Sequence, residues 1–122
     1  MSEALSSPLS QYIPAFARPK SPQDVSDPRT YDLTACLRSV LGDFILTVPE
    51  PTATVVRVDG TVNDLVISGV TVGSNAAGTT DQVINALHSG GTDGAWYRVS
   101  WAFNTNSGRS LTRSAYLLVA QL

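Results

Sequence analysis

The sequence contains little of what catalytic and metal sites are made from. It has one cysteine and one histidine in 122 residues, so it offers neither an internal disulfide nor the clustered thiols and imidazoles of a zinc site. Charged residues are only 15% of the chain, and the formal net charge is −2. The basic residues are scattered singly, a pattern that does not favour nucleic acid or an acidic membrane surface. We expect no cofactor, no metal ion, no nucleic acid and no membrane among its partners.

Targeting segments and catalytic pairs are missing as well. No apolar run reaches the roughly 20 residues of a membrane helix, and the first residues lack the regions of a secretory signal. His88 and Ser89 are adjacent, so on a strand they point to opposite faces and do not form a base and nucleophile pair. Asp59 and Asp64 flank one loop without the alternating ligands of a calcium loop, which leaves weak calcium binding as a minor alternative. We expect a protein that is not an enzyme, with His88 at the surface or at a corner.

Proline is absent after residue 51. All seven prolines fall in the first 51 residues, and five of them precede Tyr31. Proline lacks a backbone donor and restrains the residue before it, so neither a helix nor a central strand forms easily there. We therefore divide the chain into an extended Pro-rich N-terminal arm, residues 1–30, and a single domain, residues 31–122.

The arm carries apolar side chains that a purely solvated tail tends to lack. They are Leu5, Leu9, Tyr12, Ile13 and Phe16. Because ordering a segment costs about 1–2 kcal/mol per residue, their burial has to supply the compensation. We predict that Leu9, Tyr12, Ile13 and Phe16 dock on a neighbouring protein. Docking on the arm's own domain and a disordered tail are the alternatives.

The clearest signal for β-structure is the alternation over residues 96–103. The residues of one face are large and apolar: Tyr97, Val99, Trp101 and Phe103. This period of two predicts a half-buried strand. A polar connection follows, in which Gly108 suits a positive φ, and residues 110–120 then form a second apolar run. We predict a long antiparallel hairpin from these two runs.

Shorter runs upstream predict further strands. They are residues 44–48, 54–58, 64–68 and 82–87, with residues 69–72 as a separate strand or a continuation past a bulge. Helix-like spacing between Leu33 and Leu41 predicts one short helical turn, with Thr34 as its cap and Cys36 as a small buried hydrophobe. About six to eight short strands separated by turns favour an all-β, antiparallel immunoglobulin-like sandwich over a barrel.

The outward face of the strand at residues 96–103 carries an amphipathic pair. Trp96 and Arg98 are two residues apart and share that face. Trp together with Arg is a combination that protein interfaces favour. We predict both as interface residues, and a solvated face is the alternative. The pattern does not assign Tyr116 and Leu118 to the core or to this patch.

Several short motifs follow one another in a recognisable order. They are Leu41-Gly42-Asp43-Phe44-Ile45, Ser89-Gly90-Gly91, the Tyr97 that leads a strand, Thr105-Asn106-Ser107-Gly108-Arg109 and Arg113-Ser114. This order resembles that of small tailed-bacteriophage virion proteins known as fiber–tail adaptors. The last two predicted strands also resemble those of fibronectin type III or immunoglobulin-like modules, in which a Gly-containing corner precedes a Tyr.

The resemblance implies a structural virion protein of a tailed bacteriophage, an adaptor at the tail or head–tail junction that docks fibers or neighbouring tail components. The implied partners are other virion proteins: a tail adaptor or nozzle ring, the portal region, or a tail fiber. It also implies several symmetric copies and synthesis in the cytoplasm of a bacterial host. A capsid decoration protein and a carbohydrate- or receptor-binding β-sandwich module are the alternatives.

Overall fold

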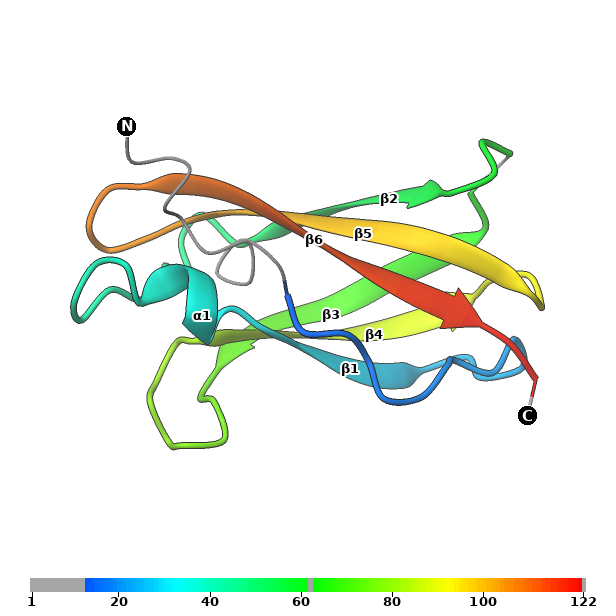
Figure 1. Ribbon diagram of the computed structural model, residues 1–122, viewed down its shortest axis with the longest axis horizontal. Coiled ribbons are helices and arrows are strands. Elements are labelled where there is room, and N and C mark those ends of the chain that lie inside the picture. Colours follow the sequence, from blue (N-terminus) through cyan, green and yellow to red (C-terminus); the bar gives the residue numbers. More distant parts are fainter. Residues whose placement is uncertain (1–12, 62, 122) are drawn as a thin grey trace.

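Antiparallel sheets packed face to face make up the fold (Figure 1). The computed structural model describes residues 13–61 and 63–121, and within them six strands form two three-stranded sheets. The elements are β1 (Asp27–Asp32), α1 (Thr34–Leu37), β2 (Thr52–Arg57), β3 (Leu65–Gly73), β4 (Val83–Gly90), β5 (Ala95–Asn104) and β6 (Ser110–Val119). One sheet has the strand order β1-β4-β3 and the other β2-β5-β6. The prediction of an all-β sandwich is confirmed.

β5 and β6 form the predicted hairpin. They pair in continuous register from Ala95↔Val119 to Asn104↔Ser110, and Gly108 in the turn has a φ of +94°. The large apolar side chains of β5 are at most 4% exposed: Tyr97, Val99, Trp101 and Phe103. The residues between them are partly or largely exposed. One face of β5 therefore belongs to the core and the other to the surface.

The core fills the space between the two sheets. Besides the inward residues of β5, it contains Tyr31, Leu65, Ile84, Ala86, Ala115, Leu117 and Val119. α1 closes one end of this space with Cys36 and Leu37, which are 5% and 1% exposed. Cys36 is thus the buried hydrophobe that the sequence predicts. Full burial of a Val, Leu or Phe side chain contributes about 1.5–3 kcal/mol, so this apolar layer is what holds the sheets together.

The runs predicted at residues 54–58, 64–72 and 82–87 correspond to β2, β3 and β4. Residues 69–72 continue β3 past a bulge, which was one of the two alternatives. The register of β3 with β4 shifts between Ser68 and Thr71. A bulge of this kind bends a strand and increases its twist.

The strand predicted at residues 44–48 is wrong. Only Ile45 makes an isolated bridge there. The Ile45 N–H donates to Asp81 O beside β4, and the Leu46 N–H donates to Asn104 O at the end of β5, each at 2.9 Å. Because consecutive donors go to the loop before β4 and to the end of β5, the segment does not run along either strand.

The helical turn begins differently from the prediction. Leu33 occupies the cap position, and no side chain caps it. Thr34 instead donates its N–H and its hydroxyl to Asp32 Oδ1, at 3.0 and 2.6 Å. The polar contact therefore closes the end of β1 and does not cap the helix.

The strand order bears on the immunoglobulin-like part of the prediction. An immunoglobulin constant-type domain has strands A, B, E and D in one sheet and C, F and G in the other. The orders β1-β4-β3 and β2-β5-β6 correspond to B-E-D and C-F-G. This correspondence supports an immunoglobulin-like topology, which otherwise stays a prediction.

The boundary expected between arm and domain, at residue 30, falls inside β1. β1 begins at Asp27 and pairs Pro28 with Leu87 of β4. A proline is tolerated here because β1 is an edge strand, where a missing N–H can face away from the sheet. The sequence argument disfavours central strands and not edge strands, so the sandwich starts earlier than residue 31.

Residues 13–26, which we name the N-terminal strap, lie against the sandwich between β6 and β1 (Figure 1). The strap runs parallel to β6 at Lys20. The Lys20 N–H donates to Leu118 O, and the Lys20 C=O accepts from the Ala120 N–H, each at 2.9 Å. The part of the predicted arm that the structure describes is therefore docked on its own domain.

The Lys20 ammonium fastens the strap. Lys20 is fully buried, and its Nζ donates to three backbone oxygens at 2.8–2.9 Å, those of Ser21, Asp24 and Gly90. Two of these bonds close the turn of the strap, and the third ties it to the end of β4. Burial lowers the pKa of this ammonium, and the carbonyl oxygens take the place of water around it.

Candidate protein-docking surface

Apolar and aromatic side chains gather on the outer face of the β2-β5-β6 sheet. We name this set the aromatic face: Val56, Val58, Trp96, Arg98 and Tyr116. Register places Arg98 directly between Val56 of β2 and Tyr116 of β6. Trp96 is the preceding outward residue of β5, and its C=O accepts from the Val58 N–H at 3.0 Å. The five side chains thus lie in two adjacent rows across the sheet.

The aromatic face is largely open to solvent. Trp96 is 49% exposed and Tyr116 53%, and both valines are exposed as well. A shallow hollow of about 150 Å³ lies between Val56, Val58, Arg98 and Tyr116. Arg98 makes no ion pair with any residue that the structure describes. A cation surrounded by exposed apolar side chains is typical of surfaces that bind other proteins.

A second hollow, of about 240 Å³, lies where the strap meets β6. We name it the strap groove. It is lined from the strap by Ile13, Ala15, Phe16 and Pro19, and from the sheet by Trp96, Ser114, Tyr116 and Leu118. Tyr116 lines both hollows, and Trp96 of the aromatic face lines the groove as well, so the aromatic face continues around the edge of the sheet into this groove.

Of the residues predicted to contact partners, Ile13, Phe16 and Trp96 line the strap groove, and Arg98 lies next to Trp96 on the aromatic face, as the spacing of these two residues indicates. Ile13 is only 6% exposed and belongs to the core. Leu9 and Tyr12 lie outside the described residues. The partner contacts proposed for these residues stay predictions.

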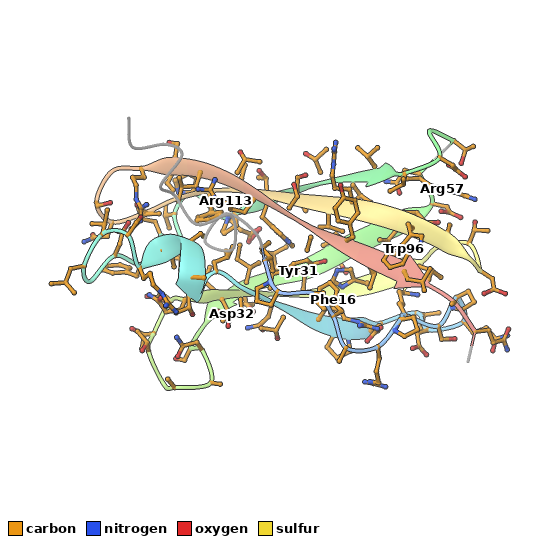
Figure 2. The ribbon with its side chains drawn as sticks, viewed as in Figure 1. Phe16, Tyr31, Asp32, Arg57, Trp96 and Arg113 are labelled. Carbon is orange, nitrogen blue, oxygen red and sulfur yellow. The ribbon has the colours of Figure 1, made fainter. Side chains whose placement is uncertain are left out.

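Phe16 points toward the sandwich and lies against Tyr31 (Figure 2). The two rings meet edge to face with 5.1 Å between their centroids. The Arg29 guanidinium lies 5.3 Å from the Phe16 ring centroid and also donates to Arg18 O at 2.6 Å. Ring pairs and cation–π contacts of this geometry contribute about 0.5–1.5 kcal/mol each. Phe16 therefore holds the strap to its own domain.

Sequence reasoning left Tyr116 unassigned and did not single out Val56 and Val58. Tyr116 faces outward because it pairs with Arg98 across the hairpin. A signal for the valines exists, since they are two residues apart like Trp96 and Arg98. Choosing which face of their strand looks outward requires the register with β5, which spacing alone does not give.

The Ser89-Gly90-Gly91 corner and Tyr97 together fix the start of β5. Tyr97 is fully buried, and its hydroxyl donates to the Asp64 carboxylate and accepts from the Thr92 N–H, the latter at 2.8 Å. Burial raises the pKa of Tyr97, and the bond to Asp64 raises it further. A Cβ at Gly91 would lie 2.7 Å from a Val119 methyl carbon, so only glycine fits there. These contacts fix the start of β5, where Trp96 stands.

The hairpin motif also has a structural role. Arg109 Nη2 lies 2.7 Å from Asp43 Oδ2, and the guanidinium also donates to Leu37 O and Ser39 Oγ. The buried Asp43 carboxylate accepts two further bonds from Ser107. Burial alone would raise the pKa of Asp43, but the hydrogen bonds from Arg109 and Ser107 outweigh it and hold the pKa well below its ordinary value. The β5–β6 turn is thereby tied to the segment after α1.

The expectation that His88 lies at the surface or at a corner is wrong. His88 is fully buried, with Nε2 2.6 Å from the Tyr31 hydroxyl and Nδ1 3.3 Å from Asp27 O. Burial lowers its pKa. Both ring nitrogens have partners, which is what allows a histidine inside. A signal was present, because His88 shares the inward face of β4 with Ile84 and Ala86 at a period of two.

A comparison with known protein families finds a match for this chain. The family model described as podophage GP4 fiber-tail adaptor protein gp77 matches residues 20–118. The chain belongs to this family. No curated protein matches the chain, and no solved structure does.

As a member of the gp77 fiber-tail adaptor family, the chain is a structural component of a phage tail, with other virion proteins such as tail fibers as its partners. The resemblance to fiber–tail adaptors that the motifs indicate is confirmed. Within residues 13–61 and 63–121, no group of three or more His, Cys, Asp or Glu side chains is placed to hold a metal ion. No helix among the described residues is long and apolar enough to cross a membrane.

Proposed function

We propose that this adaptor docks a tail fiber, or the tail component next to it, through the aromatic face, and that it does so without catalysis. The observation that carries the proposal is the exposed row of Val56, Arg98 and Tyr116 beside Trp96. Tyr, Trp and Arg are the residues that most often dominate binding energy at protein interfaces. The rigid hairpin beneath them presents these side chains in fixed positions, so the adaptor acts by geometry.

The outer face of the other sheet supports the choice of surface by contrast. Its central row consists of Thr30, Asn85 and Thr71, and Thr30 Oγ1 donates to Asn85 Oδ1 at 2.7 Å. These side chains are short, and Thr30 and Asn85 bond each other. The exposed large apolar side chains on this sheet are the aliphatic Val66 and Leu87, whereas burying an aromatic side chain removes about 150–250 Å² from water.

The adaptor acts in several symmetric copies at the tail or the head–tail junction of the virion. A ring of copies presents the same face repeatedly, and an adaptor between a tail and several fibers requires such repetition. Synthesis in the cytoplasm of a bacterial host is part of the same proposal.

The test is an Arg98→Glu variant supplied to a phage that lacks the wild-type chain. A charge reversal in the middle of the aromatic face places an acidic group where the partner accommodates a cation, so we expect at least a tenfold loss of fibers per particle. Fibers are counted by quantitative mass spectrometry of purified particles. Ser68→Glu, an exposed position on β3 of the other sheet, is the matched control and keeps its fibers.

Other outcomes separate the alternatives. Arg98→Glu particles with a full set of fibers would contradict the docking role, and if such particles also adsorbed poorly to cells, a carbohydrate- or receptor-binding module would be favoured. Cryo-electron microscopy of the virion gives the copy number. About a ring's worth at the tail supports the adaptor, and copies spread over the head would make the chain a capsid decoration protein.

A further inference from the structure

The edge of β6 beside the strap groove offers backbone groups to a further strand. In an antiparallel pair, alternate residues direct both N–H and C=O to the same side. Leu118 O accepts from Lys20 on the side away from β5, so Ser114 and Tyr116 direct their backbone groups to that side too. Among the described residues, no backbone bond reaches Ser114 or Tyr116 from there. Such an edge is a template for pairing with an extended segment.

The groove next to this edge suits apolar side chains. Its volume of about 240 Å³ is large compared with the roughly 30 Å³ share of one water molecule. Apolar side chains line most of it, and Arg18 contributes a positive charge. Arg18 makes no ion pair with any described residue. The occupant that fits is an extended, mainly apolar segment with an acidic group.

We propose that the strap groove binds residues 1–12 of a second copy of this chain. Residues 1–12 contain Leu5, Leu9 and Tyr12, and Glu3 is their only charged side chain, which complements Arg18. They directly precede Ile13, which itself lines the groove. Fully extended, twelve residues span about 40 Å.

The direction of the strap favours a second copy over the same chain. The strap runs parallel to β6, so its Ile13 end is directed toward Ser110. To fill its own groove, the chain would have to reverse before Ile13 and return along the strap. A segment from a second copy meets no such requirement.

A contact of this kind joins different surfaces of the two copies. Each copy gives its N-terminal segment to one neighbour and its groove to another, and such head-to-tail contacts close into a ring when the rotation allows. The inference goes beyond fiber docking, because it links copies of the adaptor to each other and requires no fiber.

Disulfide trapping of the purified full-length chain tests the proposal. Two variants, Leu9→Cys and Ser114→Cys, carry tags of different mass and are mixed under mild oxidation, while the native Cys36 is buried. We expect a disulfide between the two kinds of chain. Val66→Cys, exposed on β3 of the other sheet, replaces Ser114→Cys as the matched control and gives at least tenfold less of the mixed product. Equal yields at the two positions would overturn the proposal.

A double variant with Leu9→Cys and Ser114→Cys in one chain separates the remaining alternative. If it forms only an internal disulfide in a monomer, the segment occupies its own groove and the proposal fails. Sedimentation of the full-length chain gives an independent measurement. We expect self-association that Leu9→Asp weakens at least tenfold and Leu9→Met does not, and a monomer at every concentration would overturn the proposal. Arg98→Glu leaves the trapped product unchanged, so the failure of fiber docking is distinguishable.

Discussion

Trp96 and Trp101 lie on the same strand, β5, but on opposite faces of it. Trp101 is fully buried, and its ring meets Tyr31 edge to face with 5.3 Å between centroids. Trp96 is 49% exposed and stands beside Arg98, the cation that no described residue pairs. The comparison separates two uses of one residue type. Inside, a large ring fixes the distance between the sheets, and outside it remains available to a partner.

The comparison is tested most directly by removing each of the two indole rings. Trp101→Ala removes a large buried side chain and leaves a cavity, so we expect a loss of about 3–5 kcal/mol in the free energy of unfolding. Trp96→Ala removes a half-exposed ring and changes the same quantity by about 0.5 kcal/mol or less. Urea unfolding followed by circular dichroism measures both. A comparable loss from the two variants would contradict the division of β5 into an inner and an outer face.

A smaller effect is expected from a polar contact inside the molecule. Asp43→Asn keeps the size of the side chain but removes the charge that Arg109 and Ser107 bond, and we expect a loss of about 2 kcal/mol in unfolding free energy. Arg98→Gln on the outer face removes an unpaired charge and serves as the control, with a change of about 0.5 kcal/mol or less. If Asp43→Asn is as mild as its control, the hairpin motif is not held by this carboxylate.

The smallest effect concerns pH and the interior of the sandwich. Burial lowers the pKa of His88 in the folded state, so between that pKa and the ordinary value of about 6.5 the unfolded chain binds more protons. Stability is therefore complete above about pH 6.5 and falls as the pH drops below it, by at most about 1.4 kcal/mol per pH unit for this group. Unfolding midpoints between pH 7.5 and 5 measure the slope.

The control for the pH experiment replaces both partners of the buried pair. A double variant with Tyr31→Phe and His88→Leu removes the titrating ring and leaves no orphaned hydroxyl, so the slope between pH 7.5 and 5 should flatten. Persistence of the full slope in this variant would assign it to other groups.

The sequence allowed the faces of β5 and the pairing of β5 with β6 to be predicted, because a period of two reports burial directly. It also identified Trp96 and Arg98 as outward residues. Tyr116 and the valines of β2 could not be joined to them, since neighbours across strands depend on register, which is a long-range property. The motif residues Gly91 and Arg109 were recognised by resemblance, and their close packing and ion pair now give the physical reason for them.

The N-terminal strap was beyond such reasoning for a different cause. A lysine in a Pro-rich segment is expected to be solvated. The carbonyl oxygens that bind its ammonium, such as those of Asp24 and Gly90, are far apart in the sequence. No local pattern indicates that they meet. The boundary expected at residue 30 does not coincide with the start of β1, because a proline indicates a missing donor but not whether its strand lies at an edge. Both outcomes depend on where segments meet in space.

The backbone hydrogen bonds of Lys20 also determine the order in which parts of the chain fold. Its backbone bonds Leu118 and Ala120, residues that the ribosome adds long after Lys20. The strap therefore cannot pair with β6 until β6 has left the ribosome and has paired with β5. A truncated chain lacking β6 would leave the Lys20 backbone without these two partners. A closed strap is thus a mark of a formed β5–β6 hairpin, and only molecules with that hairpin in place present the groove.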